Sequence, residues 1–577
     1  MSTDYERAVR ELDASLANRL PNQILDPDRE DDGGHYSSGS GFATAAGTSG
    51  FIAQLGLAYL TPASRYFEDD AILDRLLRAV AFERRCQRPS GCIDLQGANF
   101  DSPPDTAFVV ARIAPVARVA RESDAAGAGE IEAALRPFLE DAGAGMAAGG
   151  FHTANHRWVL VGAMADVHEL YPDDALIERI EEYLAEGIDI NEDGEYTERS
   201  HGVYTNVVNR HLVAAAEALD RPDLLEPVRR SLHTVADLMD EDWTVVTEFS
   251  TRQDQGERSP PVRGTAEFYH AARRHDDERL AAAARGLLEA GGWDHGGVIR
   301  TLVSYFHRYP EWREASLPAG ERQDPVSRRM PDSGLWRIRE GRLGATVATG
   351  TKNVVALSYG DADMLGLQVT SPYFGGRFAG EEITFGEESA TVSLGTEYWH
   401  DELPGYFEPL DRPVGWGDTE LDARDVDSLP DFDIEVTAEG ADGGLDVTVS
   451  VTGGLERVPF AIEARFDPGG RIEFESGATE GEAGEASFLG SGHAVYTEGS
   501  DAIRIGPGVC EHRIADPPGT DDPSNVTRLL LTDWAPFERT VEIRGDSWLA
   551  LGGDPPVTPN ARAGDASGRG PDERTDR

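Results

Sequence analysis

The feature that most constrains the fold is a single change of hydrophobic periodicity near Pro331. From about residue 44 to 290, apolar residues recur every three or four positions, as in helices that bury one face. Beyond Pro331, short β-prone runs alternate with glycine-rich turns, a pattern typical of a β-sandwich. The sequence therefore predicts two domains in series, one helical and one built of strands.

Ten helices are predicted in the first region, and they occur in pairs. Pairs spaced by roughly 50 residues are typical of helical hairpins that stack on their neighbours. Five or six such pairs can curve into an incomplete α/α toroid, and a straight solenoid is the alternative. The predicted helices span residues 44–60, 70–86, 105–122, 129–147, 155–170, 174–187, 202–219, 223–239, 263–274 and 277–290.

The second region predicts an antiparallel β-sandwich. Its β-prone runs are 334–349, 354–369, 434–436, 445–451, 457–466, 487–495, 502–506, 527–532 and 540–543. The expected organisation is therefore a lead-in (1–43), an α/α toroid that carries the site (44–315), a β-sandwich (330–552) and a tail (553–577). The tail is rich in Pro, Gly, Asp and Arg, a composition that favours disorder.

The net charge indicates the salt content of the solvent more than the identity of a binding partner. The chain has 104 acidic against 53 basic residues, a formal net charge of −51, and Lys352 is its only lysine. Such a surface is typical of proteins from halophiles, because at multimolar salt the Debye length is about 3 Å or less and repulsion among carboxylates is screened. A generically acidic protein with a cationic partner is the alternative. No basic stripe could neutralise phosphates, so a nucleic-acid partner is not expected.

Cysteine content and hydropathy favour a cytoplasmic protein without a membrane partner. Cys86, Cys92 and Cys510 make no disulfide framework and are expected to be reduced thiols. The N-terminus lacks a charged region followed by an apolar one, so no signal peptide is predicted. No apolar stretch approaches the ~18 residues of a membrane-spanning helix.

Polar residues gather where three of the predicted helices begin. These segments are 99–106, 151–158 and 193–204. In a toroid, loops that lead into alternate helices converge on one mouth, where a sugar site is expected. Taken singly, Asn155 and Asp105 could be helix caps and His156 a packing residue. The combination of three polar helix starts favours a functional site.

Two of these segments resemble a known family. An Asn155-His156 pair begins one helix, and Asp193-Gly194 is followed, after nine further residues, by Tyr204. This pattern is similar to that of the heparinase II/III and oligoalginate lyase superfamily. The resemblance implies an incomplete α/α toroid joined to a β-sandwich, and β-elimination on a uronate-containing oligo- or polysaccharide. It implies that Asn155 and His156 hold and neutralise the substrate carboxylate while Tyr204 takes and returns the proton.

The chemistry explains why such residues are needed. The C5 proton of a uronate is weakly acidic beside a carboxylate, so polar donors must share the charge that develops as it leaves. A tyrosine, with an ordinary pKa near 10, can act as the base when nearby cations stabilise its anion. Arg199 could help in this. The residues predicted to bind substrate are Arg157, His201, Arg210, Asp105, Asn99, Glu248 and Arg252.

No metal is expected, with calcium and zinc as alternatives. Residues 357–364 match the early sandwich segment that carries a histidine in the lyases, and this segment has none. The sequence Tyr398-Trp399-His400 could substitute or could form an exposed aromatic turn. Residues 189–194 resemble the start of a calcium loop, but Ser200 stands where a glutamate is expected.

Two other functions fit the same sequence. A toroid glycoside hydrolase would use two carboxylates, such as Asp105, Glu198 or Glu248. A glycan-binding or scaffolding protein whose site has lost catalysis is the other, and the missing sandwich histidine favours it. The polar run 247–254 could supply a loop at the toroid mouth in any of the three, or could be a solvated turn.

Overall fold

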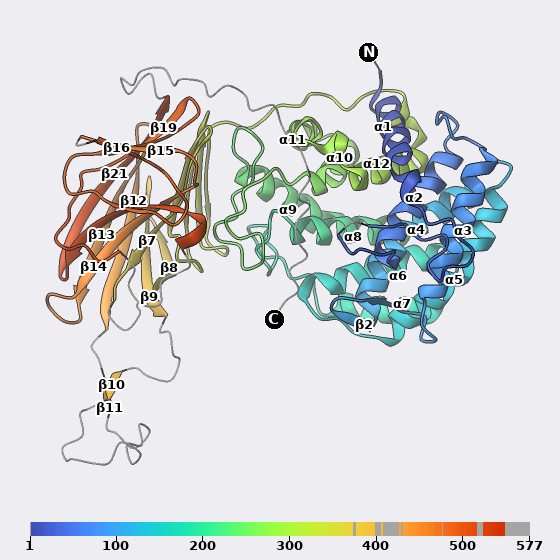
Figure 1. The fold of residues 1–577 in the computed structure, drawn as a ribbon, viewed down its shortest axis with the longest axis horizontal. Coiled ribbons are helices and arrows are strands. Elements are labelled where there is room, and N and C mark those ends of the chain that lie inside the picture. The colour runs from blue at the N-terminus through green and yellow to red at the C-terminus, as the bar shows by residue number, and fades with distance from the viewer. Residues whose placement is uncertain are drawn as a thin grey trace.

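The computed structural model describes residues 2–37, 39–372, 377–397, 405–407, 426–428, 431–475, 477–515 and 523–547. It places a helical domain beside a domain of strands (Figure 1). The expected fold class, an incomplete α/α toroid followed by an antiparallel β-sandwich, is confirmed. The predicted tail (553–577) and the segment Tyr398-Trp399-His400 lie outside the described residues.

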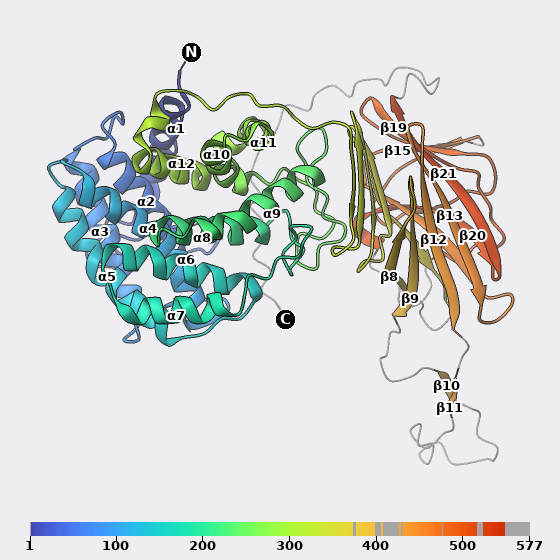
Figure 2. The same cartoon turned by 180° about the vertical axis from the view of Figure 1, so that it is seen from behind.

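The toroid is built from helix pairs, with even-numbered helices forming the inner ring. Each inner helix packs against its predecessor, and α12 also contacts α1 and α2, so the first and last parts of this domain meet (Figures 1 and 2). A short hairpin of β1 (Ile93–Leu95) and β2 (Asn99–Ser102) precedes α4. The helices are α1 (Asp4–Arg19), α2 (Ala45–Leu60), α3 (Asp70–Cys86), α4 (Pro103–Glu122), α5 (Ala128–Ala148), α6 (Ala154–Leu170), α7 (Asp174–Ala185), α8 (Tyr204–Ala218), α9 (Leu225–Leu238), α10 (Thr265–His275), α11 (Glu278–Glu289) and α12 (Gly296–Arg308).

All ten predicted helices are present, and α1 and α12 are additional. Helix α1 lies in the region interpreted as a lead-in, where Thr3 and Glu6 form a capping box and every third or fourth residue from Ala8 to Leu16 is buried. Helix α12 is capped by the side chain of His295, whose Nδ1 accepts from the Val298 amide. Histidine is not among the usual capping residues, so the start of α12 gave no recognisable signal.

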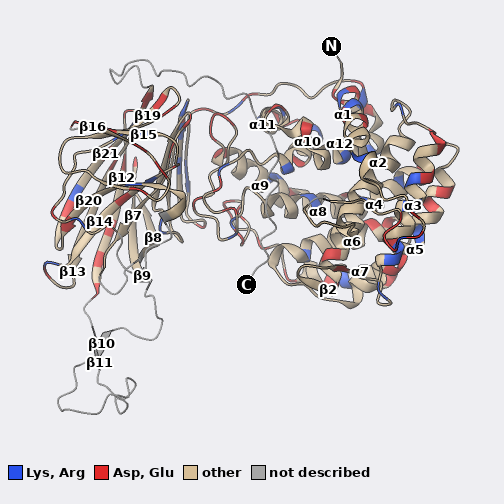
Figure 3. Ribbon diagram, viewed as in Figure 1, with Lys and Arg blue, Asp and Glu red and all other residues tan. Residues whose placement is uncertain are grey.

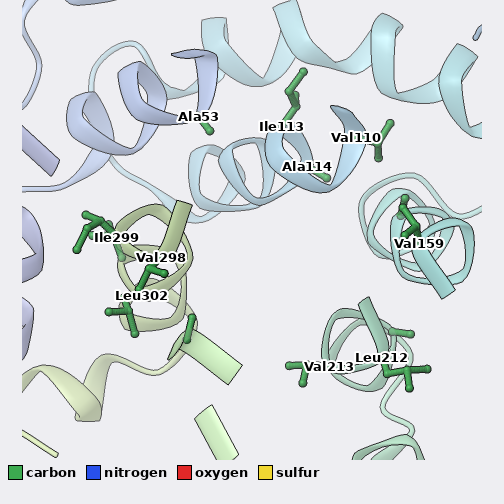
Figure 4. Close-up of a cluster of buried hydrophobic side chains, with 14 of the residues drawn as sticks. Ala53, Val110, Ile113, Ala114, Val159, Leu212, Val213, Val298, Ile299 and Leu302 are labelled. Atoms are coloured by element: carbon green, nitrogen blue, oxygen red, sulfur yellow. The ribbon is translucent and has the colours of Figure 1, made fainter. Parts of the chain in front are cut away.

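The inner helices approach closely and share one apolar core. Side chains from five inner helices meet in it, including Ala53, Ile113, Val159, Leu212 and Leu302 (Figure 4). Glycines permit the approach: a Cβ at Gly56 would lie 2.2 Å from Val116 Cγ1, and a Cβ at Gly162 would lie 2.6 Å from the His211 carbonyl oxygen. Larger residues there would push α2 from α4 and α6 from α8.

The sandwich consists of two sheets that enclose a second core. All pairings are antiparallel except that of β17 with β20, and one pair, Thr370 with Arg377, links the sheets. The first sheet has the order β3 (Val326–Met330), β4 (Leu335–Glu340), β5 (Leu343–Ala348), β6 (Val355–Tyr359), β7 (Ala362–Thr370), β14 (Pro459–Phe466), β20 (Thr527–Trp534), β17 (Ala486–Phe488). The second has the order β8 (Arg377–Phe385), β9 (Ser389–Glu397), β12 (Phe432–Ala441), β13 (Gly444–Gly453), β21 (Phe537–Ser547), β19 (Asp501–Gly506), β18 (Ala494–Glu498), β15 (Arg471–Phe474), β16 (Gly477–Glu480). Strands β10 (Gly405–Phe407) and β11 (Val426–Ser428) form a separate pair.

Every predicted β-prone run contains strand. Among the described strands, the sequence did not predict β1, β2, β3, β8, β9, β10, β11, β15 or β16. β16, with the sequence Gly-Ala-Thr-Glu, shows the reason: it is short, it ends a sheet, and it has no run of apolar residues. Such strands are held by their neighbours rather than by their own pattern.

The first sheet faces the toroid through buried charges. Arg337 of β4 is fully buried and ion-paired with Asp240, which also accepts from Ser358 (3.1 Å) and lies 3.2 Å from Arg258. Acidic residues otherwise spread over both domains (Figure 3). No helix among the described residues is long and apolar enough to cross a membrane.

Candidate active site

Three segments of the toroid build the candidate site. Helix α6 begins at residue 154, helix α8 begins at residue 204, and the loop of residues 247–254 follows α9. The backbone amide of Tyr204 donates to Ser200 Oγ (3.1 Å), which fixes the first turn of α8. The predicted convergence of polar helix starts is therefore present for these two helices, with the loop between them.

A chain of polar contacts joins α6 to α8. Asn155 Nδ2 donates to Glu198 Oε1 (3.0 Å) and to Thr153 Oγ1 (3.0 Å). The same Glu198 oxygen lies 3.7 Å from the guanidinium of Arg252, whose central carbon is 4.7 Å from the ring centroid of Tyr204. The Oδ1 atom of Asn155 is buried and finds no hydrogen-bond partner in the described part of the chain, so one polar group of the site is left for a ligand.

His156 lies beside this chain of contacts and is kept neutral. Burial lowers the pKa of His156 to about 4; the charges of His152 and Arg252 act in the same direction and that of Asp105 acts against them. Its ring packs edge-on against that of Phe108, with the ring centroids 6.0 Å apart. Its Nδ1 atom is buried and has no hydrogen-bond partner among the described residues. At neutral pH the imidazole therefore offers one N–H donor and carries no charge.

The loop of residues 247–254 completes the surroundings of Tyr204. The Tyr204 hydroxyl donates to Gln253 Oε1 (3.1 Å). Asp254 holds the loop against the start of α8, because its carboxylate accepts from Ser200 Oγ (2.9 Å) and from the Gly202 amide (3.1 Å). Sequence reasoning proposed this run as a loop at the mouth, but no pattern singled out Gln253.

The segment before α8 is tied to the sandwich. Arg199 has φ 50°, a left-handed conformation that costs a non-glycine residue free energy and persists only where its surroundings hold it. Its guanidinium donates to the carbonyls of Ser333 (2.9 Å) and Thr349 (3.1 Å) of the β-domain. The sandwich thus helps to position Glu198 and Tyr204, which flank Arg199 in sequence.

Asp105 and Asn99 lie at the start of α4. Asn99 Nδ2 donates to Asp105 Oδ2 (3.1 Å), and Ser102 Oγ donates to the same carboxylate oxygen (2.5 Å). Helix α4 lies beside the site because the ring of its Phe108 contacts that of His156, and the charge of Asp105 acts to raise the pKa of His156. Six of the predicted residues, Asn155, His156, Tyr204, Arg252, Asp105 and Asn99, are therefore near one another.

The other four predicted residues have partners elsewhere. Arg157 is ion-paired with Glu186 (2.9 Å) and Asp189 (3.1 Å), which lie at and after the end of α7. His201 is buried against Phe249, and burial lowers its pKa to about 3.

Arg210 and Glu248 complete this set. Arg210 is ion-paired with Glu267 (3.0 Å) and lines a cavity inside the toroid. Glu248 is buried and paired with Arg258, which also binds Asp363 (2.8 Å) of the sandwich. Glu248 therefore belongs to the contact between domains.

In the loop that resembles a calcium site, the side chains form hydrogen bonds with other parts of the protein. Asp189 accepts from the Trp158 indole (2.6 Å), and Asp193 accepts from the Ser333 amide (2.9 Å). Asn191 donates to Ser333 Oγ (2.9 Å). Within the described ranges, no group of three or more His, Cys, Asp or Glu side chains is arranged to hold a metal ion.

Comparison with known proteins was made by sequence and by structure. No family model and no curated protein sequence matches the chain. Among solved structures, heparan sulfate lyase HepC from Pedobacter heparinus is similar with a TM-score of 0.53 at 9% identity, over 95% of this chain and 86% of that one. A heparinase III gives 0.54 at 9% identity, over 95% and 85%. A Paenibacillus xanthan lyase gives 0.54 at 8% identity, over 94% and 57%.

The chain has the fold of these polysaccharide lyases. The similarity extends through both domains, so the fold that the resemblance implied, a toroid joined to a sandwich, is confirmed. Because fold does not fix activity, the assignment of chemistry depends on the side chains of the site.

Proposed function

We propose that this protein is a polysaccharide or oligosaccharide lyase that cleaves a uronate-containing glycan by β-elimination. The observation that carries the proposal is the convergence of Tyr204 and Asn155, from two different helix starts, on the pair formed by Glu198 and Arg252. The lyase fold supports it by analogy.

Tyr204 is the proposed proton carrier. As a tyrosinate, its oxygen takes the proton from C5 of the uronate, and the electron pair left on C5 forms the double bond to C4. The bond from C4 to the glycosidic oxygen breaks, and that oxygen receives the proton from the Tyr204 hydroxyl. Arg252, against the ring, stabilises the tyrosinate while it exists.

Asn155 and His156 are the proposed holders of the substrate carboxylate. As C5 loses its proton, negative charge grows on this carboxylate, and donors placed there in advance lower the barrier. The amide of Asn155 donates to Glu198 and to Thr153, so it must release one of these hydrogen bonds to bind the substrate carboxylate. The neutral imidazole of His156 can donate a further hydrogen bond.

A hydrolase is the second candidate, because one carboxyl group has the character of a general acid. Burial raises the pKa of Glu198, and hydrogen bonding from Asn155 and the charge of Arg252 only partly oppose this. An acid of raised pKa beside a second carboxylate is the requirement for glycoside hydrolysis. Asp105, one of the carboxylates predicted for a hydrolase, is the candidate for the second role.

The two functions are separated by product and by variant. We expect uronate oligosaccharides, incubated with the protein in strong salt, to yield an unsaturated uronate that absorbs in the ultraviolet. Tyr204→Phe removes only the hydroxyl and should lower turnover by about 10²–10⁴-fold, the usual contribution of a general acid–base group. Tyr36→Phe, which changes an exposed tyrosine distant in sequence from Tyr204, is the matched control.

An active Tyr204→Phe enzyme with an inactive Glu198→Gln enzyme, and products without ultraviolet absorbance, would establish hydrolysis instead. Circular dichroism in the same salt checks that each variant is folded.

A further inference from the structure

The toroid encloses a cavity of about 410 Å³ beside the candidate site. Phe108, whose ring contacts His156, is part of its wall, and so are Val203 and Asn206 on either side of Tyr204. The exposed residue Arg263 also lines it, so one side is open to solvent. Its lining is unusual for a chain with a net charge of −51, because basic side chains outnumber acidic ones. The charged lining residues are Arg112, Arg118, Arg210, Arg263, Arg300, Arg308, Asp166 and Glu217.

Three of these arginines are neutralised by carboxylates. Arg118 lies 3.3 Å from Asp166, and Arg308 lies 2.9 Å from Glu169. Arg210 is paired with Glu267 at 3.0 Å. The other three, Arg112, Arg263 and Arg300, form no ion pair with any carboxylate that the structure describes.

Arg300 is the least satisfied of them. Its half-buried guanidinium has neither a hydrogen bond nor an ion pair within the described residues, although it lines the cavity. Its neighbours are cations: burial, and then the charges of Arg112, Arg19 and Arg210, lower its pKa to about 9. Arg19 donates to Gln54 (2.8 Å) and to the Gly47 carbonyl (3.2 Å), but burial and the charge of Arg112 likewise lower its pKa to about 10.

Neutral polar groups in the same wall are also unsatisfied. The Nε2 atom of His211 and the Oδ1 atom of Asn206 are buried and without partners in the described part of the chain. Buried polar atoms that find no partner in the protein mark a place for a ligand or water. An anion would accept hydrogen bonds from Arg300. The Nδ1 atom of His211 donates to the Val207 carbonyl (2.7 Å), so Nε2 of this neutral ring is an acceptor, as Asn206 Oδ1 is, and water between them and the anion would supply their donors.

We propose that the toroid cavity is a binding site for a small oxyanion of the sulfate, phosphate or carboxylate class. Guanidinium groups match such anions through paired N–H donors, and a buried charge is stable only when it is paired. An anion seated between Arg300 and Arg112 removes the mutual repulsion of these cations. The site is distinct from the carboxylate-holding residues Asn155 and His156 and does not depend on the proposed lyase activity.

The test is binding of sulfate to the full chain, measured by calorimetry and by melting temperature. Ionic strength is held constant with KCl. We expect saturable binding to the unmodified chain and binding about 10- to 100-fold weaker to Arg300→Met, the usual loss for a hydrogen bond to a charged group. Arg229→Met, an exposed arginine of α9, is the matched control and should bind as the unmodified chain does.

A second readout separates anion binding from a purely structural role. Without sulfate, Arg300→Met should melt at a higher temperature than the unmodified chain, because one unpaired, half-buried charge among other cations is gone. Sulfate should then raise its melting temperature no more than general exclusion of this salt does. A parallel titration with glucuronate distinguishes an anion carried on a sugar from a free inorganic one. Absence of saturable binding of both anions, or equal binding by Arg300→Met, overturns the proposal.

Discussion

Arg252 places its guanidinium carbon 4.7 Å from the ring centroid of Tyr204 while a nitrogen of the same group lies 3.7 Å from Glu198. One cation therefore serves both a tyrosine and a carboxylate, and both come from the segment that leads into α8. A site that moves a proton through Tyr204 depends on this charge being in place.

Replacing Arg252 should reduce catalysis more than binding. Arg252→Met keeps much of the side-chain length and removes the charge, so turnover should fall by about 10²–10³-fold, as when one preorganised donor is lost. Arg252→Lys should recover part of the loss, because it restores charge but not the planar group. Steady-state kinetics gives kcat and KM separately, with Arg136→Met on the outer helix α5 as control. A change confined to KM would contradict the role given to Arg252.

The stability of the toroid should fall with acid through His211. Burial lowers the pKa of His211 to about 4, and the charges of Arg210 and Arg112 also lower it, from an ordinary value of 6.5. Between pH 6.5 and pH 4, His211 is protonated in the unfolded chain and neutral in the folded chain. Its contribution to the free energy of unfolding is therefore present above pH 6.5 and is lost as the pH falls toward 4.

His211→Gln removes this dependence. When the pH is lowered from 7 to 5, the free energy of unfolding of the unmodified chain should fall by about 2 kcal/mol more than that of the variant. Denaturant unfolding in strong salt at the two pH values gives the difference, and His168→Gln, at the end of α6, serves as control. A constant difference between variant and unmodified chain would show that His211 does not titrate this way.

The contact between the domains should depend on the pair of Arg337 and Asp240. Arg337 is fully buried, and Arg337→Met leaves the carboxylate of Asp240 with less compensation inside the protein. Removing one partner of a buried pair typically costs about 3–5 kcal/mol. Because Arg258 still pairs with Asp240, the lower end of that range is expected. Calorimetric melting checks this, with the exposed Arg329→Met on β3 expected to change stability by less than about 0.5 kcal/mol.

Folding should require salt. The net charge of −51 makes the folded chain repel itself, and screening shortens the range of this repulsion from about 10 Å at 0.1 M to about 3 Å at 1 M salt. The melting temperature should therefore rise steeply with KCl. Sucrose at matched osmolality is excluded from the surface but screens nothing, so it should stabilise far less. A melting temperature independent of KCl would refute this.

The positions of the helices could be predicted because burial imposes a period on the sequence. In α3, Ile72, Leu76 and Val80 repeat every fourth residue and are all buried. Strand β16 could not be predicted, since its four residues are short of apolar side chains and depend on β15 for their pairing.

The site was predicted in part, and helix geometry explains the rest. Asn155 and Tyr204 were expected to converge because both begin helices of the inner ring. Arg157 was expected with them, yet residues two apart on a helix face nearly opposite directions, so Arg157 turns toward Glu186 when Asn155 turns inward. Glu248 and Gln253 lie in a loop without a repeating pattern, and their directions follow only from the packing of the two domains.

The loop of residues 247–254 holds the sandwich at one end and the tyrosine at the other. Glu248 is ion-paired with Arg258, which also forms an ion pair with Asp363 of β7. Arg252 and Gln253 contact Tyr204. The β-domain therefore supports the position of Tyr204 through this loop. A longer turn between β6 and β7 would weaken this support. It would displace the guanidinium of Arg252 from the ring of Tyr204, although the insertion itself would lie in the sandwich.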